Sequence, residues 1–508
     1  MEKVFYDPFV LRLVLIQADY DAVINYCRSY VLAASVCYDP IFWLQKAREK
    51  LGVSSEIFRN TNLPADQRYL QLATLMDKDL GYGSEQYINN KQFVKRAIER
   101  NRLDLLEYII NKGFKDWDSA LFHAARVHNV ELMNRFLQIT QNYSTAAYGA
   151  LQGGHQDLFD YIYSIAPEGW DWQKLADYAA KSGSQNLLDY IFSITPPGYQ
   201  WNWQELAEKA IISGSQIVFD HIRSLASSFQ WEWMRLAINA ISEGHKELFN
   251  HIRFLAPANY PWNNNLNFLA RIALHRGNFE LFDYIRSIAP ADYSWNWNAL
   301  ASGSLEGKHK ELFDYIRSLA PADYSWNWNS MAVASLVSGS QILFDHVQSL
   351  APSNYLWDWN ELVRASIRSQ NQQLFDYVRS LVPFNYHLAW NSFAETAVYT
   401  NNKELLRYIM LISHFTDWNW ESLVYSALSN NYMDLSDYIL SLVPANYQWN
   451  WNWLAHSVAR TGIRNFDYVR SLAPPNYEWN WNFILMNIQG PMRDYILSLV
   501  PSNYQLNF

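Results

Sequence analysis

The chain has 508 residues, a formal net charge of −9 and an isoelectric point near 5.8. Apolar residues make up 50% of it and aromatic residues 16%, a composition that excludes an intrinsically disordered chain. The acidic balance, without blocks of like charge, argues against general nucleic-acid binding, which a basic patch usually marks. No apolar run approaches about twenty residues, so the sequence predicts no membrane span.

The cysteine content is low. Cys27 and Cys37 are the two cysteines of the chain, too few for a disulfide scaffold, and this count favours a reducing compartment and a cytoplasmic protein. The apolar run over residues 9–16 is interrupted by Arg12 and lacks a small-residue cleavage site. We therefore interpret it as a packed helix and not as a signal peptide.

Residues 1–55 do not follow the pattern of the later chain, and they predict three helices. The first starts at the Asp-Pro pair of residues 7–8, the second spans about residues 21–36, and the third starts at the Asp-Pro pair of residues 39–40. Residues 56–90 carry scattered turn residues and indicate a helical connector.

These three segments read D-P-F-V-L-R-L-V-L-I, D-Y-D-A-V-I-N-Y-C-R and C-Y-D-P-I-F-W. In this order they resemble an F-box, and also the F-box-like leader that precedes ankyrin-type repeats in many proteins of amoeba-infecting giant viruses. The resemblance implies docking onto a cullin-type ubiquitin ligase subunit. The docking residues that it implies are Phe9, Leu13, Ile16, Ile41 and Trp43. The alternative is a three-helix cap that closes the first repeat, since solenoids need terminal caps.

Residues 91–508 form a tandem array that ends in a truncated repeat. The unit G-K-H-K-E-L-F-D-Y-I-R-S-L-A-P-A-D-Y-S-W-N-W-N, at residues 307–329, recurs about fourteen times with most spacings between 29 and 33 residues. The Tyr of L-F-D-Y or its substitute stands at Tyr108, Phe136, Tyr161, Tyr190, His221, His251, Tyr284, Tyr315, His346, Tyr377, Tyr408, Tyr438, Tyr468 and Tyr495. Such a period predicts a solenoid, because one unit cannot bury its apolar face without a neighbour.

Each unit predicts a helix, a turn, a second helix and a loop. Asn329 is the expected N-cap of a short first helix, called helix A, which Gly339 ends in the left-handed conformation. Helix B is expected over residues 341–351, and Pro352 stops it.

Two segments of the array are similar to ankyrin repeats. M-R-L-A at residues 234–237 with G-H-K-E-L at 244–248 matches the ankyrin pattern, and G-H-Q-D-L at 154–158 repeats its second half. The resemblance covers about residues 90–508 and implies an all-α, ankyrin-like solenoid whose concave binding surface includes helix A. The 14 residues from Tyr315 to Asn329 are too few for a full β-hairpin finger, so short Trp-rich loops are expected.

Trp-x-Trp pairs mark these loops, at residues 170/172, 201/203, 231/233, 295/297, 326/328, 357/359, 418/420, 449/451 and 479/481. An exposed aromatic ladder for sugars or proline-rich peptides is one interpretation. Burial of a Trp removes on the order of 150–250 Å² from water, worth roughly 4–6 kcal/mol at most, so we favour packing between repeats.

Charged and variable positions give two further hypotheses. Asp/Arg pairs spaced i,i+3 in helix B, at 283/286, 314/317, 376/379 and 467/470, predict a solvated ladder, with an acidic partner as the alternative. In helix A a Leu-Ala pair recurs, whereas the residue two positions after the Leu varies. These variable residues are Asp177, Glu208, Ile238, Arg271, Ser302, Val333, Arg364, Glu395, Tyr425 and His456. We predict that they bind a partner; the alternative is neutral drift at a surface.

Catalytic motifs are missing from the sequence. It has no Gly-rich phosphate loop, H-E-x-x-H, G-x-S-x-G or Cys/His metal spacing, so we expect neither an enzyme nor a cofactor. The predicted function is a protein-interaction scaffold, and in the first hypothesis it is an adaptor that links a target to a host ubiquitin ligase. In the second it is a structural or packaging component of a virus particle, with virion proteins as partners. A host protein bound without any ligase is a third partner class.

Overall fold

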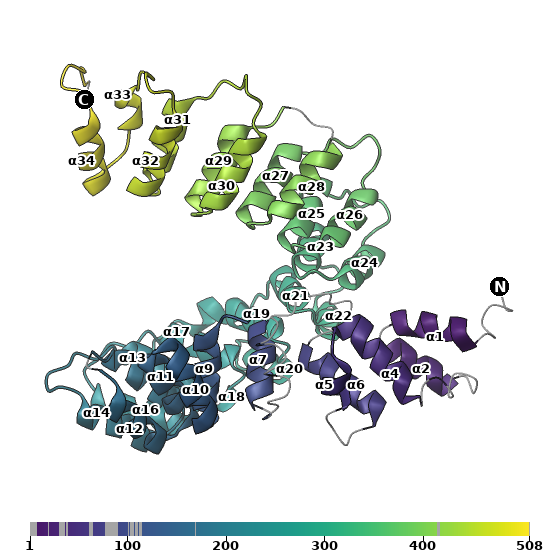
Figure 1. Ribbon diagram of the computed structural model, residues 1–508, viewed down its shortest axis with the longest axis vertical. Coiled ribbons are helices and arrows are strands. Elements are labelled where there is room, and N and C mark those ends of the chain that lie inside the picture. The colour runs from purple at the N-terminus through teal and green to yellow at the C-terminus, as the bar shows by residue number, and fades with distance from the viewer. Residues whose placement is uncertain are drawn as a thin grey trace. The chain divides into compact units, whose positions relative to one another are not determined.

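The computed structural model describes residues 8–18, 20–29, 36, 39–59, 64–76, 90–99, 101, 106, 110, 114–167, 169–413 and 417–506. It divides into two compact units, Met1–Ala256 and Pro257–Phe508, which are treated separately below. Every regular element in the described ranges is a helix and none is a strand. The predicted all-α helical repeat fold is thereby confirmed (Figure 1).

The N-terminal module of the first unit consists of short helices. They are α1 (Pro8–Gln17), α2 (Tyr20–Ser29), α4 (Pro40–Lys46), the π-helix η2 (Ala47–Leu51), α5 (Ser55–Arg59) and α6 (Ala65–Met76). The expected helix start at residue 40 is present, and Asp39 caps it by accepting the Ile41 N–H at 2.8 Å. Helix α6 packs on α4, and its Tyr69 is fully buried against the indole of Trp43. The second part of the module thus shares the core of the first.

The array of the first unit begins with α7 (Asn90–Glu99) and continues as pairs of helices A and B. The pairs are α9 (Trp117–Arg126) with α10 (Val130–Thr140), α11 (Tyr143–Gly153) with α12 (Gln156–Ile165), α13 (Trp172–Lys181) with α14 (Gln185–Ile194), α15 (Trp203–Ile212) with α16 (Gln216–Leu225), and α17 (Trp233–Ser242) with α18 (Lys246–Leu255). From α9 to α15 each helix A contacts both its own helix B and the helix A of the next repeat, and α17 contacts α18.

The second unit continues the same plan after a short 3₁₀ helix, η3 (Trp262–Asn265). Its pairs are α19 (Leu266–His275) with α20 (Phe279–Ser287), α21 (Trp297–Glu306) with α22 (Lys310–Leu319), α23 (Trp328–Val337) with α24 (Gln341–Leu350), α25 (Trp359–Arg368) with α26 (Gln372–Ser380), α27 (Trp390–Tyr399) with α28 (Lys403–Ser413), α29 (Trp420–Ser429) with α30 (Met433–Leu442), α31 (Trp451–Ala459) with α32 (Ile463–Leu472), and α33 (Trp481–Ile484) with α34 (Gly490–Leu499).

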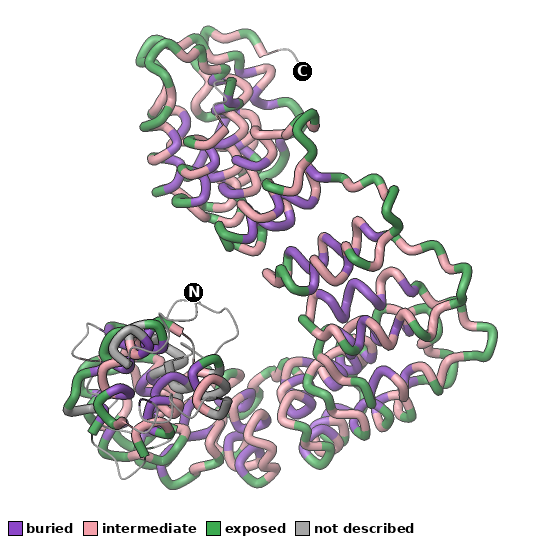
Figure 2. The backbone as a smooth tube through the Cα atoms, turned by 90° about the vertical axis from the view of Figure 1, so that its right-hand side faces the viewer, coloured by how far each residue is buried: buried purple, intermediate pink, exposed green. Residues whose placement is uncertain are grey.

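Ala, aliphatic and Phe side chains form the buried interior of each repeat. In α22 the pattern Leu-Phe-x-x-Ile places Phe313 and Ile316 fully inside, and in α21 Leu300 and Ala301 are equally buried. Buried stretches, drawn in purple, recur along the helices in the tube of Figure 2. Gly149 of α11 lies so close to α9 that a Cβ there would come within 2.3 Å of the Phe122 carbonyl oxygen. The helices A therefore stack at close range through small residues.

The predicted C-terminal end of helix A is confirmed, but the predicted N-cap is not. Gly339 follows α23 with φ +80°, the predicted left-handed conformation. The N-cap, however, is Asn327 and not Asn329, because the Asn327 side chain accepts the Ser330 N–H at 3.0 Å. Helix α23 thus begins at Trp328, two residues after the first Trp of the pair. The prediction was wrong because the second Trp is the first residue of the helix and not part of the loop.

One expectation about cysteine chemistry was also wrong. Cys27 on α2 is disulfide-bonded, whereas the low count predicted reduced cysteines. A count gives no information on whether two sulfur atoms lie within bonding distance, which depends on the backbone between them. Cys37 lies outside the described residues.

Candidate partner-binding face

The ten variable residues all lie on helices A, from α13 to α31, each two positions after a buried Leu, Met or Phe. We call the side of helix A that carries them the helix-A face. Asp177, Glu208 and Ser302 are buried, and the other seven are half-buried. The face is therefore not the open surface that sequence variation suggested. It borders the neighbouring helix A, and most of its residues contact that helix.

In the first unit these contacts are polar. The Asp177 carboxylate accepts a hydrogen bond from the Gln173 amide at 2.9 Å on the same helix. Glu208 of α15 accepts one from Gln204 at 3.1 Å and pairs with Arg235 of the next helix A at 2.7 Å. Each buried carboxylate therefore has a hydrogen-bond donor, the side-chain amide of a Gln one turn away, and Glu208 also has a cationic partner from the next repeat.

Burial is the largest influence on Asp177. It raises the pKa of this carboxyl to about 7; the hydrogen bond from Gln173 lowers it, and the negative charge of Glu205 raises it further. Asp177 thus changes charge near neutral pH while it lies between α13 and α15.

In the second unit the face changes from charged to aromatic residues. Arg271 pairs with Glu306 of the next helix A at 2.6 Å, and the Ser302 hydroxyl lies 3.3 Å from the Ser330 hydroxyl. The Ser422 hydroxyl donates to Glu395 at 2.5 Å. Two aromatic positions follow, where Tyr425 packs against Trp453 at 5.9 Å and His456 against Phe483 at 5.1 Å, measured between ring centres.

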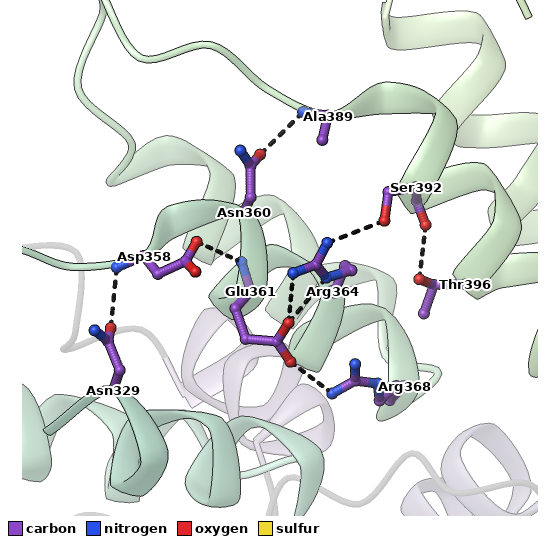
Figure 3. A network of polar contacts seen from close by, with 9 residues as sticks. All are labelled: Asn329, Asp358, Asn360, Glu361, Arg364, Arg368, Ala389, Ser392 and Thr396. Carbon is purple, nitrogen blue, oxygen red and sulfur yellow. Dashed lines mark hydrogen bonds and ion pairs between the residues drawn. The ribbon is translucent and has the colours of Figure 1, made fainter. Parts of the chain in front are cut away.

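A polar network on this face surrounds Glu361 on α25 (Figure 3). Arg364 donates to its carboxylate at 2.6 and 2.9 Å, and Arg368 donates to it at 2.9 Å. Arg364 also reaches the Ser392 hydroxyl of α27 at 3.1 Å. Partial burial would raise the pKa of Glu361, but the hydrogen bonds and charges of the two arginines outweigh it and lower that pKa. Two cations around one anion leave this patch with a positive charge.

The Trp-x-Trp pairs lie between repeats. The second Trp is buried in most helices A, for example Trp328 at 6% exposure, and the first Trp is half-buried in most loops. A loop aromatic packs on the first indole with ring centres 4.6–5.1 Å apart, as Tyr199 does on Trp201 and Tyr447 on Trp449. The structure thus agrees with the packing interpretation of these tryptophans.

The second residue of nine helices A, among them the predicted N-cap Asn329, forms a ladder between repeats. We call it the loop ladder. In each rung the side-chain oxygen of this second residue accepts the backbone N–H of the N-cap residue of the next helix A, at 2.7–3.1 Å. The acceptors, each with the number of the residue whose N–H it accepts, are Gln173 (202), Gln204 (232), Asn267 (296), Asn298 (327), Asn329 (358), Asn360 (389), Asn391 (419), Glu421 (450) and Asn452 (480). Figure 3 shows the rungs at Asn329 and Asn360. Recurrence of Trp-Asn-Trp-Asn was the available signal for it.

A second ladder joins helices B. The marker Tyr or His donates to the Asp of the preceding repeat, as in Tyr377 to Asp345 at 2.7 Å, His221 to Asp189 at 2.6 Å and Tyr408 to Asp376 at 2.8 Å. In these repeats the imidazole Nε2 takes the place of the phenol oxygen against the Asp carboxylate, so the histidines do act as substitutes for Tyr. Three of the expected Asp/Arg pairs are present at 3.4–3.8 Å, but Asp314 instead pairs with His346 and Lys310. These carboxylates are therefore inter-repeat acceptors as well as solvated charges.

The five predicted docking residues of the N-terminal module differ in accessibility. Ile16 and Trp43 are buried, whereas Ile41 is 63% exposed. Phe9 and Leu13 belong to α1, and their side chains lie outside the described part. A partner of the folded module can reach Ile41 but not Ile16 or Trp43, because the latter two pack in its core.

Among the described residues, no group of three or more His, Cys, Asp or Glu side chains is placed to hold a metal ion. Within the same ranges no helix is long and apolar enough to cross a membrane.

No protein-family model and no curated protein matches the chain. Among solved structures it is similar to one described as "Circular tandem repeat protein with novel repeat topology and enhanced subunit contact surfaces", with 18% identity over 96% of each chain and a TM-score of 0.11. Such a TM-score does not relate the two folds, and the assignment as a helical repeat protein therefore rests on the helices and contacts described above.

Proposed function

We propose that the protein is a non-enzymatic protein-interaction scaffold whose partner binds the helix-A face. The supporting observation is the contrast within each repeat. Trp, Asn, Tyr and Asp recur and hold neighbouring repeats together, whereas the half-buried residues of helix A change in charge and shape. Arg364 and Arg368 are the most accessible charged pair of the Glu361 network, with 27% and 39% of their side chains exposed. A protein target is the natural ligand of such an extended array of side chains.

The experiment is affinity purification from host-cell lysate with the full chain, followed by mass spectrometry. Arg364→Ala/Arg368→Ala removes two charges from the helix-A face, and Arg286→Ala/Arg379→Ala removes two from helices B of the same unit as a matched control. Loss of a partner with the first variant alone supports the proposal. Equal recovery with both variants contradicts it, provided that thermal unfolding shows both chains to be folded.

The adaptor role is a finer proposal, in which the N-terminal module binds a cullin-type ligase subunit. Ile41→Glu is the sharper test, since deletion of the first sixty residues would also expose Tyr69 of α6. Ile217→Glu, at another exposed isoleucine of the first unit, is the control. Ligase subunits lost with Ile41→Glu alone support an adaptor. Recovery of no ligase, together with ordered self-association, would favour a structural component of a virus particle.

A cytoplasmic location belongs to the same proposal. It conflicts with the bonded Cys27, because disulfides persist chiefly in oxidising compartments. Mass spectrometry after rapid thiol alkylation in intact cells decides between the two. An alkylated Cys27 was a free thiol and supports a reducing compartment, whereas a Cys27 that is still in a disulfide contradicts it.

A further inference from the structure

The loop between α16 and α17 departs from the repeat. Leu225 and Trp231 are six positions apart, whereas the equivalent Leu319 and Trp326 are seven apart. The Pro that recurs in most of the other loops is also missing. In the regular loop Pro321 starts the turn and accepts the N–H of residue 324 at 2.9 Å; here Ala226 does so, accepting the N–H of residue 229 at 3.0 Å. The deleted residue is therefore the one between the helix end and the turn.

This deletion changes how the chain leaves helix B. Ala226 has φ −109° and ψ 47°, whereas Ala320, after α22, is extended with φ −69° and ψ 150°. The altered loop borders a pocket of about 440 Å³. Its lining consists of Asp220, Arg223, Ser224, Ser227, Phe229, Trp231 and Trp233, all in one repeat connection of the first unit. A pocket of this size falls in the range that holds small ligands.

One wall of the pocket is aromatic. The Phe229 ring meets the Trp231 indole at 4.8 Å with an interplanar angle of 65°, and Trp231 remains half-buried, not buried. Phe229 stands where the regular loops have Tyr, whose hydroxyl in other repeats joins the loop ladder, as Tyr355 does with the Asn329 N–H at 3.2 Å. The absence of this hydroxyl leaves a purely apolar ring in the lining of the pocket.

The other wall is polar and close to neutral. Asp220 accepts from His251 at 2.8 Å and from Arg223 at 3.3 Å, so its charge is already balanced. The equivalent Arg317 instead lies over the Trp328 indole at 5.6 Å. Arg223 contacts the acid, and its remaining donors and the Ser227 hydroxyl line the pocket beside the aromatic wall. The Ser224 hydroxyl also lines the pocket but donates its proton to the His221 carbonyl at 2.7 Å, so it can only accept from a ligand.

We propose that this pocket binds a neutral sugar ring of a glycan. A pyranose has an apolar C–H face that stacks on an indole, and hydroxyls at its edge that pair with carboxylate, guanidinium and hydroxyl groups. Charged ligands of either sign are disfavoured because Asp220 and Arg223 already pair with each other and leave no unbalanced charge in the pocket. A proline-rich peptide needs an extended aromatic groove, whereas this pocket is confined to one loop. The inference does not depend on the proposed scaffold function.

The test is saturation-transfer-difference NMR on the full chain with three probes, the methyl β-glycosides of glucose, galactose and N-acetylglucosamine, and with decaproline. In the first variant residues 226–230 are replaced by A-P-A-D-Y-S, the loop of residues 320–325, which restores the regular length and closes the pocket. The second variant is Trp231→Ala. Trp201→Ala changes the same position in the preceding repeat, where the loop has regular length, and is the matched control.

We expect transfer to at least one glycoside, reduced at least about tenfold in the loop variant and in Trp231→Ala but retained in Trp201→Ala. The melting temperature of each variant shows whether it is folded. If only one of the loop variant and Trp231→Ala is folded, that one is sufficient for the comparison with Trp201→Ala. No transfer to any glycoside in the parent chain would overturn the proposal, as would transfer that persists after the loop is restored. Transfer to decaproline alone, lost in the loop variant, would assign the pocket to peptides and overturn it as well.

Discussion

Trp328 and Val333 lie on the same helix, α23, but belong to two differently organised regions of the repeat. Trp328, like its equivalents in other repeats, is buried between repeats beside the loop ladder. Val333 is a half-buried member of the helix-A face, where the residue changes from acid to base to aromatic along the chain. Residues that recur in this array thus make contacts that are common to the repeats. Residues that vary lie where each repeat makes its own local contacts.

The largest expected effect comes from removal of a recurrent Trp. Trp328→Ala is predicted to destabilise its repeat by about 3–5 kcal/mol because it leaves a cavity, whereas Val333→Ala costs about 1 kcal/mol or less. Because repeat arrays unfold in coupled local units, the measurement is urea unfolding together with hydrogen exchange of residues 328–337. Equal effects of the two substitutions would remove the distinction between the two regions.

A second prediction concerns the close stacking of helices A. Gly149→Ala is predicted to cost about 2–4 kcal/mol, since the new Cβ would lie 2.3 Å from a backbone oxygen of α9 that cannot move freely. Gly154, just after the same helix, is the control: its Cβ would meet nothing within 4 Å, and only its φ of +80° is strained. Gly154→Ala should therefore cost about 1–2 kcal/mol. The opposite order in thermal unfolding would contradict the observed helix spacing.

The third prediction is a pH dependence of the helix-A face. Burial raises the pKa of Asp177 to about 7 from its ordinary 3.8, so the folded chain holds a proton that the unfolded chain releases. Stability is then lost as the pH rises from about 4 to 7, and the loss persists above 7. Asp177→Asn should be more stable than the parent by about 4 kcal/mol at pH 8 and equal to it near pH 4, as measured by urea unfolding.

Glu361→Gln is the matched control for Asp177→Asn, because its effect on stability should depend on pH in the opposite direction. The two arginines lower the pKa of Glu361, so its charged form stabilises the fold above its ordinary pKa, and this contribution is lost as the pH falls through the folded value. Glu361→Gln should destabilise the chain at pH 7 and have little effect in acid. Parallel pH profiles of the two variants would refute the assigned charge environments.

The smallest expected effect tests one rung of the loop ladder. Asn329→Ala leaves the Asp358 N–H without its acceptor and should cost about 1–2 kcal/mol. Asn329→Asp keeps an oxygen at the same place, as Glu421 does naturally for residue 450 at 2.7 Å, and should cost much less. Hydrogen exchange of the Asp358 amide separates the two: it should become faster with Ala and stay slow with Asp.

Much of the fold could be predicted from the sequence, because a 31-residue period with Leu-Ala in one helix and Leu-Phe in the other leaves few ways to bury both faces. The left-handed Gly339 also followed from local chemistry. The N-cap could not be placed, since Asn327 and Asn329 both have suitable side chains. The choice depends on whether Trp328 is in the loop or in the helix, and burial against the next repeat decides that.

The candidate site was harder to predict for a related reason. Variation singled out the ten helix-A positions, but it could not reveal that Glu208 reaches Arg235 or that Arg271 reaches Glu306. Such pairs join residues about one repeat apart, and they depend on the offset between stacked helices, which no local pattern encodes. The same offset hid the Tyr–Asp ladder, whose members appeared to be solvated charges when each helix was considered alone.

The most direct test of the division into two regions is hydrogen exchange of the full chain with and without a captured protein target. A target that binds the helix-A face should protect the amides of helices A, including residues 359–368 around the Glu361 network, and leave those of helices B unchanged. Protection confined to helices B or to the Trp-x-Trp loops would contradict the proposed binding face and show that recurrent residues, not varying ones, bind the partner.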